Sequence, residues 1–436
     1  MSKPTVNIFW FRRDLRLTDN HGLQKALKGN LPVIPIFIFD KNILDKLPEK
    51  DARVSFIHRQ LQNMRTRLES EYNSSLAVYY GTPVKVFSKI LEDFEVESVF
   101  ANHDYEPYAE RRDNQVYDLF ETEYIEFYTY KDQVIFEKEE VVKDDGDPYV
   151  VYTPYMKKWK EVFKDLSLEE FEIDPYAGNF YQSTELPYLR LEDMGFKPSS
   201  VRVPDYDLSS ETIRNYEDTR NFPAQDGTSR IGPHLRFGTV GIRSVYKKAL
   251  AEQNETFLNE LIWREFFMQI LWHFPHTKDE SFKKKYDRIE WRNNEEEFRL
   301  WCEGKTGYPL VDAGMRELNA TGYMHNRVRM LVGSFLCKHL LIDWRWGEAY
   351  FAEKLLDYEM ASNVGNWQWV AGSGVDAAPY FRIFNPTTQI KKFDEDRKYI
   401  KEWVKEFDSD TYPEPIVDHK EARERCLKVY KAALDG

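Results

Sequence analysis

An α/β amino-terminal domain followed by a mostly α-helical domain is the fold class that this sequence predicts. The first 130 residues alternate short runs rich in Val, Ile, Phe and Tyr with amphipathic stretches of helical spacing. That alternation is typical of a doubly wound parallel sheet with helices on both faces. Helical spacing dominates after residue 205. We therefore expect domains over 1–130 and 206–436, with an interdomain connection over 131–205.

Five apolar runs are expected to form the strands, because β-branched and aromatic residues suit a buried, pleated surface. These runs are Thr5–Phe11, Leu31–Phe39, Leu76–Tyr80, Ser98–Asn102 and Tyr124–Tyr130. The helical stretches between them are roughly His21–Lys28, Ala52–Tyr72, Pro83–Phe94 and Tyr108–Phe120. No GxGxxG follows the first run and no GxxxxGK[ST] occurs, which excludes the ordinary dinucleotide-binding and P-loop classes.

The rest of the chain divides by its periodicity. Asp144–Pro148 is typical of turns and Glu185–Asp207 is irregular with several prolines, which is why 131–205 is interpreted as a connection. The runs Phe257–His273 and Gly314–Leu341 predict long helices. The tail after Pro386 is expected to be less regular.

Composition limits the function classes. Three scattered cysteines argue against a disulfide framework or a Cys-based zinc site, and we expect no metal. Met1–Asn7 has no secretory pattern and no apolar window approaches about 18 residues, so we expect a cytoplasmic monomer without membrane contact. The net charge of −13 opposes nucleic-acid binding on average, but basic residues slightly exceed acidic ones between Asp226 and Tyr350. Screening over about 10 Å lets such a local face bind DNA.

Eight of the eleven tryptophans lie between Trp263 and Trp369. Tryptophan is a good core residue, so composition alone favours a packing role. The neighbouring residues favour a site. In a helix, Glu260 and Trp263 share one face, an arrangement suited to gripping a flat heterocycle. The segment Met324–Met330 adds an amide and two arginines, which suit an anionic ligand.

These segments resemble the photolyase/cryptochrome family, with the class I cyclobutane pyrimidine dimer photolyases as the most similar branch. The resemblance covers nearly the whole chain and is densest from Gly227 to Gln389. Its most specific parts are Gly227–Arg230, Gly304–Pro309 and Trp367–Pro386. It implies a helical domain that binds FAD, and light-dependent repair of UV-damaged DNA by electron donation to a flipped-out dimer.

The resemblance also implies which residues hold FAD. The segment for the FAD phosphates comprises Tyr216, Thr228, Ser229, Arg230 and Ile231, and the residues beside the flavin ring are Arg329, Asp357, Glu359 and Asn363. Arg329 and Asp357 resemble the family's buried ion pair beside this ring, where a fixed cation would stabilise the anionic reduced form. Two positions depart from the branch: Gly232 stands where a serine is common, and Glu359 replaces an aspartate.

A second implied set contacts the lesion and DNA: Glu260, Trp263, Asn326, Arg327, Met330, Trp369 and Gln389. Phe257 replaces a tryptophan that often lies beside these residues. Trp367, Trp344 and Trp291 resemble a chain that carries electrons to photoexcited flavin. The expected catalytic residues are therefore Glu260, Asn363 and this tryptophan chain. Trp272, Trp301 and Trp346 are left to the core.

Several alternatives stay open. A cryptochrome-type blue-light photoreceptor would use the same scaffold, although its usual mark is an altered lesion pocket. Repair of 6-4 photoproducts uses a histidine pair where this chain has His325 followed by Asn326. A flavin-binding protein without photochemistry would leave the tryptophans unexplained. A second, antenna chromophore is also implied: a folate, a deazaflavin or FMN. Tyr108-Ala109 stands where folate binders have an Asn-Glu pair.

Overall fold

The computed structural model describes residues 3–435 and contains two compact units. The first comprises the chain up to Glu140 together with Phe163–Tyr206 and Arg230–Ala251, and the second comprises Val141–Val162, Asp207–Ser229 and the chain from Glu252 onward. The units are thus interleaved along the chain, whereas the sequence predicts continuous domains, whose boundaries stay a prediction. Met1 and Ser2, from the segment expected to lack a secretory signal, and Gly436 lie outside the described residues.

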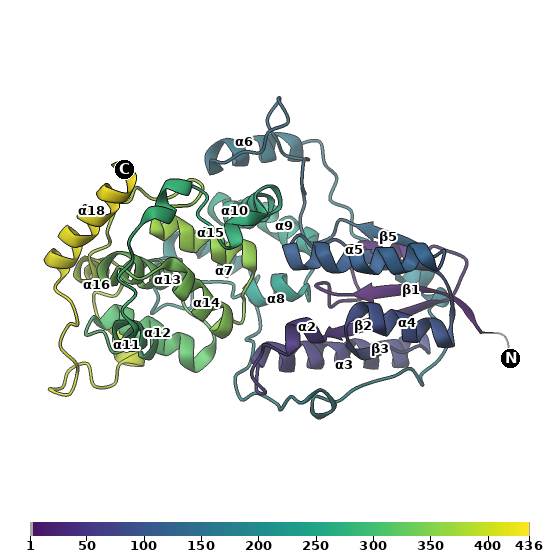
Figure 1. The fold of residues 1–436 in the computed structure, drawn as a ribbon. Helices are drawn as coiled ribbons and strands as arrows, with labels where there is room; N and C mark the ends of the chain where they lie inside the picture. The colour runs from purple at the N-terminus through teal and green to yellow at the C-terminus, as the bar shows by residue number, and fades with distance from the viewer. Residues whose placement is uncertain (1–2, 436) are drawn as a thin grey trace. The chain divides into compact units, whose positions relative to one another are not determined.

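The first unit is built on a five-stranded parallel sheet of order β3-β2-β1-β4-β5 (Figure 1). The strands are β1 (Thr5–Phe11), β2 (Val33–Asp40), β3 (Ala77–Gly81), β4 (Glu95–Asn102) and β5 (Glu126–Tyr130). Ile8 of β1 lies opposite Ile34 of β2 and Val99 of β4. The strand order reverses direction at β1, which is the doubly wound topology that the sequence predicts.

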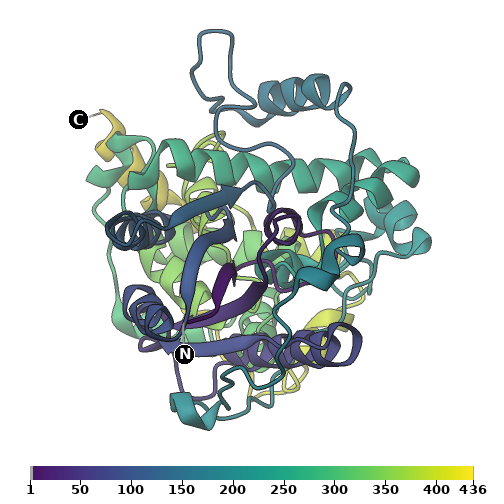
Figure 2. The same ribbon diagram turned by 90° about the vertical axis from the view of Figure 1, so that its right-hand side faces the viewer.

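Both faces of this sheet are covered by helices (Figure 2). Ile8 and Trp10 of β1 pack in one cluster with Phe87 of α4. The alternate residue Phe9 faces α1, where a Cβ on Gly22 would lie only 2.9 Å from its ring. Glycine is therefore required where this helix meets the sheet. The helices and short 3-10 helices of this unit are α1 (His21–Leu27), α2 (Lys41–Leu44), α3 (Ala52–Tyr72), α4 (Pro83–Asp93), α5 (Pro107–Thr122), η1 (Asp174–Asn179), η2 (Glu192–Met194), α8 (Gly232–Phe237) and α9 (Ile242–Ala251).

The second unit is helical throughout. Its elements are α6 (Tyr152–Phe163, of which Phe163 falls in the first unit), α7 (Ser210–Thr219), α10 (Glu255–His273), η3 (Pro275–Lys278), η4 (Lys284–Arg288), α11 (Glu295–Glu303), α12 (Pro309–Thr321), α13 (Asn326–Ser334), the π-helix η5 (Phe335–Leu340), α14 (Trp344–Lys354), α15 (Met360–Ala371), α16 (Pro386–Phe393), α17 (Lys398–Trp403) and α18 (His419–Asp435). No helix within residues 3–435 combines the length and apolarity that crossing a bilayer requires.

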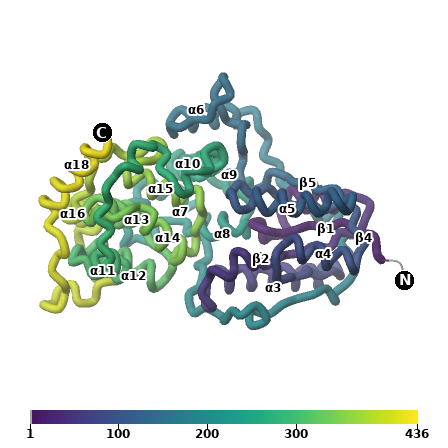
Figure 3. The backbone as a smooth tube through the Cα atoms, in the orientation of Figure 1, coloured from purple at the N-terminus to yellow at the C-terminus, as the bar shows by residue number. Residues whose placement is uncertain are grey.

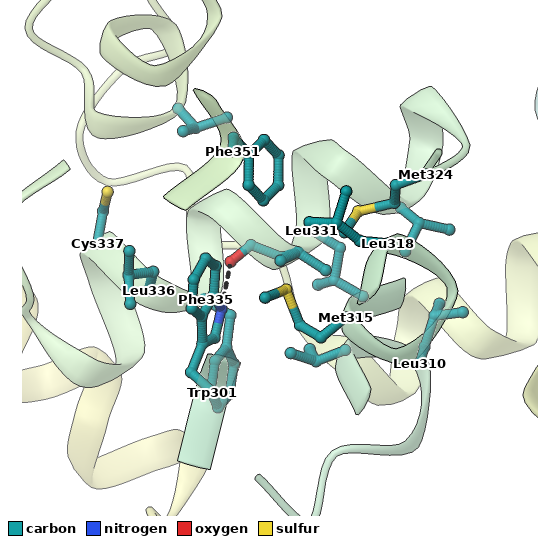
Figure 4. Packing of buried hydrophobic residues seen from close by; sticks show 14 of the residues in the cluster. Trp301, Leu310, Met315, Leu318, Met324, Leu331, Phe335, Leu336, Cys337 and Phe351 are labelled. Atoms are coloured by element: carbon teal, nitrogen blue, oxygen red, sulfur yellow. Dashed lines mark hydrogen bonds between the residues drawn. The ribbon is translucent and has the colours of Figure 1, made fainter. Parts of the chain in front are cut away.

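A large apolar cluster forms the core of this unit and places the helices that carry the predicted site. Trp301 is fully buried in it and donates its indole Nε1–H to the carbonyl oxygen of Val332 at 3.3 Å (Figure 4). Trp344 and Trp367 belong to the same cluster. The expectation that Trp301 is a core residue agrees with this packing.

The elements differ from the sequence prediction at three places. Helix α6 lies in the segment interpreted as an irregular connection. The expected helix over Gly314–Leu341 is broken, because Gly322 adopts φ 69° and ends α12. The tail expected to be less regular contains the 17-residue helix α18, which packs on η5 and η4 (yellow in Figure 3).

Candidate active site

A bidentate ion pair joins Arg329 of α13 to Asp357, which lies just before α15. The Nη1 and Nη2 atoms of Arg329 donate to the Asp357 carboxylate at 3.2 and 2.9 Å, and its Nε donates to the carbonyl oxygen of Met324 at 2.6 Å. Burial lowers the pKa of Arg329, but the facing carboxylate outweighs that effect and raises it. The side chains are 22% and 17% exposed. The pair is therefore a fixed, largely desolvated cation with its counter-charge.

The loop before residue 230 connects to this ion pair through Tyr323. The hydroxyls of Thr228 and Tyr323 lie 3.3 Å apart, and the Arg329 guanidinium sits 5.8 Å from the centre of the Tyr323 ring. Gly227 lets the loop pack on α7, because a Cβ there would lie 2.4 Å from Cβ of Thr219. A hydroxyl-bearing loop is thus held beside a buried cation, a combination suited to an anionic ligand.

The other residues assigned to the phosphate segment fall in both units of the chain. Tyr216 lies on α7, where its ring meets Phe257 edge to face at 5.2 Å. Ser229 is buried and its carbonyl oxygen accepts from the backbone N–H of Asp207 at 2.9 Å. Arg230 is exposed and Ile231 is buried, and both belong to the first unit. Tyr216, Thr228 and Ser229 therefore belong to the second unit, whereas Arg230 and Ile231 do not.

Asn363 of α15 is oriented by Glu348 of α14. Its Nδ2 donates to Glu348 Oε1 at 2.9 Å and to the Glu348 carbonyl oxygen at 3.2 Å. Burial raises the pKa of Glu348. Because both bonds use the amino group, the amide oxygen of Asn363 is the atom available to accept from a ligand. Glu359, at the start of the same helix, is buried and accepts from the Ser362 hydroxyl at 3.0 Å.

Glu260 of α10 pairs with Arg220, the residue that ends α7. Burial raises the pKa of the Glu260 carboxyl, and Arg220 opposes this without cancelling it. The Arg220 guanidinium also lies 5.7 Å from the centre of the Tyr216 ring. Arg220 and Glu348 were not predicted from the sequence, since each acts on a residue that is distant along the chain.

Trp263, one turn after Glu260, is stacked on Tyr152 with ring centres 3.6 Å apart and planes 6° apart. Trp369, on α15, is half-buried, and no ring contact joins it to Trp263 among residues 3–435.

The remaining predicted DNA-contacting residues lie on α13 and α16. Arg327 donates to Asn221 Oδ1, and its guanidinium lies 4.5 Å from the centre of the Phe393 ring of α16. Its Nη1 lies 3.7 Å from the sulfur of Met330. Burial lowers the pKa of Arg327, and the nearby Arg220 and Arg382 lower it further. Asn326 is exposed, while Met330 and Gln389 are half-buried.

The three tryptophans of the predicted electron chain are in different environments. Trp367 is buried and its ring contacts Phe351 at 5.0 Å and Trp301 at 6.3 Å. Trp344 is buried with no hydrogen-bond partner on its Nε1 among the described residues. Trp291 is half-buried and meets Tyr430 of α18 edge to face at 6.0 Å. In the described part of the chain, the tryptophan whose ring contacts Trp367 is thus Trp301 rather than Trp344.

Comparisons with known proteins show what this chain is similar to. Two family models match: "DNA photolyase" over residues 7–175 and "FAD binding domain of DNA photolyase" over residues 257–409. A deoxyribodipyrimidine photo-lyase of Halobacterium salinarum is 36% identical to this chain, and the match covers 98% of this chain and 99% of that protein. A class III photolyase from Agrobacterium tumefaciens has a TM-score of 0.88 at 32% identity, covering all of this chain and 99% of that one. An archaeal photolyase from Sulfolobus tokodaii with two FAD molecules has a TM-score of 0.83 at 36% identity, covering 98% and 99%.

Proposed function

The chain belongs to the photolyase/cryptochrome family, and on that basis we propose that it repairs cyclobutane pyrimidine dimers in UV-damaged DNA with light. One observation carries the proposal. Helix α13 carries Arg329, assigned to the flavin, two positions after Arg327, assigned to DNA. Helix α15 likewise carries Trp367, assigned to electron supply, two positions before Trp369, assigned to the lesion. Two positions turn a helix by about 200°, so each helix would serve the flavin or its electron supply on one side and DNA on the other. An electron donor and its acceptor would then be held by the same two helices.

The residues of the second unit suit FAD. The Thr228 and Ser229 hydroxyls and the Arg329 cation match its pyrophosphate and its anionic ring, and the Asn363 amide matches a ring nitrogen. Within this unit we assign FAD binding to Tyr216, Thr228, Ser229, Arg329, Asp357, Glu359 and Asn363. Arg230 and Ile231, which belong to the first unit, stay a prediction from the family resemblance. When bound and reduced, FAD supplies the light-driven electron that splits the dimer and then recovers it.

His325 gives an independent indication of a ligand beside α13. Its Nδ1 accepts from the backbone N–H of Arg327, so its proton resides on Nε2, which is buried and has no partner among residues 3–435. Burial lowers the pKa of His325 to about 4, so the ring is neutral at pH 7. An unsatisfied buried N–H costs about 1–3 kcal/mol, and an acceptor on a bound ligand would remove that cost.

Lesion binding is assigned to Glu260, Trp263, Asn326, Arg327, Met330, Trp369 and Gln389. Trp263 and Trp369 would stack on the flipped bases, each contributing roughly 1–3 kcal/mol by analogy with single-strand binders. The raised pKa of the Glu260 carboxyl favours its protonated form. Only a protonated carboxyl can donate a hydrogen bond to a base carbonyl oxygen. Arg327 would contact a phosphate.

The tryptophans Trp367, Trp344 and Trp291 are assigned to reduction of the flavin in light. An antenna chromophore is also proposed, as a folate, a deazaflavin or FMN; the second FAD of the S. tokodaii photolyase favours a flavin among these. Assignment to class I and a monomeric state in the cytoplasm complete the proposal.

Repair of a thymine-dimer oligonucleotide tests it. Purified protein, reduced and illuminated with blue light, should remove dimers, while the same mixture in the dark should not. Glu260→Ala and Trp263→Ala should keep their flavin and lose repair or lesion binding. Absence of light-dependent dimer loss in the wild-type protein would refute repair and favour a sensory role.

A further inference from the structure

Tyr152, at the start of α6, covers one face of the Trp263 indole. The two rings are parallel within 6° at 3.6 Å, and Tyr152 is only 7% exposed whereas Trp263 is half-buried. We infer that Tyr152 is a positioning residue that fixes the plane of Trp263 for stacking on the dimer. The inference rests on the proposed function and goes beyond it, because Tyr152 belongs to neither assigned set.

Tyr152 is itself held from three directions, so its ring is a rigid support. Its hydroxyl donates to the carbonyl oxygen of Asn259 at 2.8 Å, and its backbone N–H donates to Asp376 Oδ2 at 3.2 Å. Its ring also meets Phe266 edge to face at 5.8 Å. Burial and the nearby Glu260 raise the pKa of the Tyr152 phenol, so the hydroxyl remains a donor.

Helix α6 is fastened along α10, the helix that carries Trp263. Trp159 Nε1 donates to Glu265 Oε2 at 2.6 Å in the buried interior. Gln269 Nε2 donates to the carbonyl oxygen of Tyr149 at 2.9 Å, just before α6 begins. Together with the Tyr152 bond to Asn259, these bonds span about three turns of α10. Tyr152 is therefore fixed relative to Trp263 by the fold and not by the ring stack alone.

This geometry determines how Trp263 can bind a base. An indole has two faces, and Tyr152 occupies one of them. A flipped base can therefore stack only on the ring surface that Tyr152 and the neighbouring rings of Phe266 and Phe267, 5.6 and 5.5 Å away, leave exposed. Holding the ring in place before binding removes the rotamer entropy that an unsupported side chain would lose. Tyr152 would thus raise affinity for the dimer without contacting it, and would not affect binding to undamaged DNA, which depends on phosphate contacts.

The test is equilibrium binding in the dark, with FAD-loaded protein and labelled duplexes with and without a thymine dimer. Tyr152→Ala should weaken dimer binding roughly three- to tenfold and leave undamaged-DNA binding unchanged. Tyr152→Phe keeps the stack and loses only the bond to Asn259, so it should bind the dimer like wild type. A double substitution separates positioning from packing: in a Trp263→Ala background, Tyr152→Ala should have no further effect on dimer affinity.

Tyr155→Ala is the matched control, since it also removes a buried tyrosine ring from α6, one that packs on Phe266 and not on Trp263. Both alanine variants should lower the melting temperature, but only Tyr152→Ala should reduce discrimination between damaged and undamaged DNA. Equal loss of discrimination in both would overturn the inference and leave α6 a structural brace. A folded Tyr152→Ala protein with wild-type dimer affinity would also overturn it. No discrimination by the wild-type protein would overturn the proposed function as well.

Discussion

Gly347 of α14 lies directly against the Trp367 indole, and Gly347→Ala should impair photoreduction while sparing repair. An added Cβ would lie 2.1 Å from Trp367 Cη2 and 2.6 Å from Leu336 Cδ2. Carbon atoms normally approach to about 3.5–4.0 Å. Trp367 is 4% exposed and cannot move outward freely. The indole must therefore tilt or shift by more than about 1 Å.

Two opposing terms set the size of the effect on stability. Alanine gains about 1 kcal/mol over glycine in helix propensity. Overpacking a well-filled core costs about 1–3 kcal/mol, and more where a ring cannot relax. The expected net loss is about 1–2 kcal/mol, which lowers the melting temperature by several degrees in a unit of this size.

Gly333→Ala is the control, because it approaches the same indole from α13 without a clash. Its Cβ would meet Val370 Cγ2 at 3.2 Å and Trp367 Cζ3 at 3.5 Å, which are tight and ordinary contacts respectively. This variant should keep the propensity gain and melt no lower than wild type. The difference between the two variants isolates displacement of Trp367.

The assay measures flavin photoreduction under blue light with an external thiol, and separately repair by dithionite-reduced protein. Gly347→Ala should photoreduce at least several-fold more slowly and repair at close to the wild-type rate once reduced. Wild-type photoreduction with an unchanged melting temperature would refute the packing argument. Loss of repair by the pre-reduced protein would refute the restriction of Trp367 to electron supply.

Three further predictions concern stability and cofactor retention. Asp357→Asn leaves the Arg329 cation buried without its partner, so we expect a loss of about 3–5 kcal/mol and less flavin per protein, measured by melting and absorbance; retained flavin at wild-type stability would contradict it. On acidification, unfolded protein takes up a proton at a histidine pKa near 6.5 whereas folded His325 does so only at about 4, so stability present above pH 6.5 falls as the pH approaches 4. Urea titrations should show about 2 kcal/mol less loss between pH 7 and 5 in His325→Asn, which keeps an acceptor for the helix start; an unchanged pH slope would exclude His325 as the cause. Gly238→Ala would place a Cβ 2.0 Å from the carbonyl oxygen of Arg13 at φ 64°, so the first unit should lose several kcal/mol or fail to fold, as circular dichroism would report; a wild-type melting curve would contradict the close approach.

The sheet was predictable because its signal is local. Strand β1 begins and ends as the sequence predicts, and the other strands differ by up to three residues at an end. Alternating strand and helix patterns leave few possible topologies, and right-handed crossovers reduce them further. The helix over Ala52–Tyr72 was equally clear, since Asp51 caps it and apolar residues recur at helical spacing along it.

Helix α6 shows where local patterns mislead. Val150, Val151 and Pro154 near its start read as strand and turn residues, yet proline is tolerated in the first turn of a helix. Its buried positions Tyr152, Tyr155 and Trp159 recur at helical spacing. This short helical pattern lies within a segment whose prolines and turn residues predict an irregular connection.

Some residues of the candidate site could be predicted from the sequence, and others are visible only in the structure. The ion pair of Arg329 with Asp357 was expected from the family resemblance, and the structure contains it. The partners Arg220 and Glu348 could not be inferred, because tertiary packing alone brings them to Glu260 and Asn363. Family motifs name the residues that face a ligand, and the supporting contacts depend on packing that no single motif records.

The tryptophans at 367 and 369 illustrate what the structure adds to a motif. In the sequence they form one Trp-Gln-Trp run, and nothing local separates their roles. On α15 they point about 200° apart. Trp367 is enclosed with Phe351 and Trp301, so it cannot touch DNA, whereas Trp369 keeps enough exposed surface for a base to stack on it. The two proposed roles, electron supply by Trp367 and lesion binding by Trp369, would therefore be separable on one helix. A substitution that displaces only the buried ring, as Gly347→Ala does, should affect the first and spare the second.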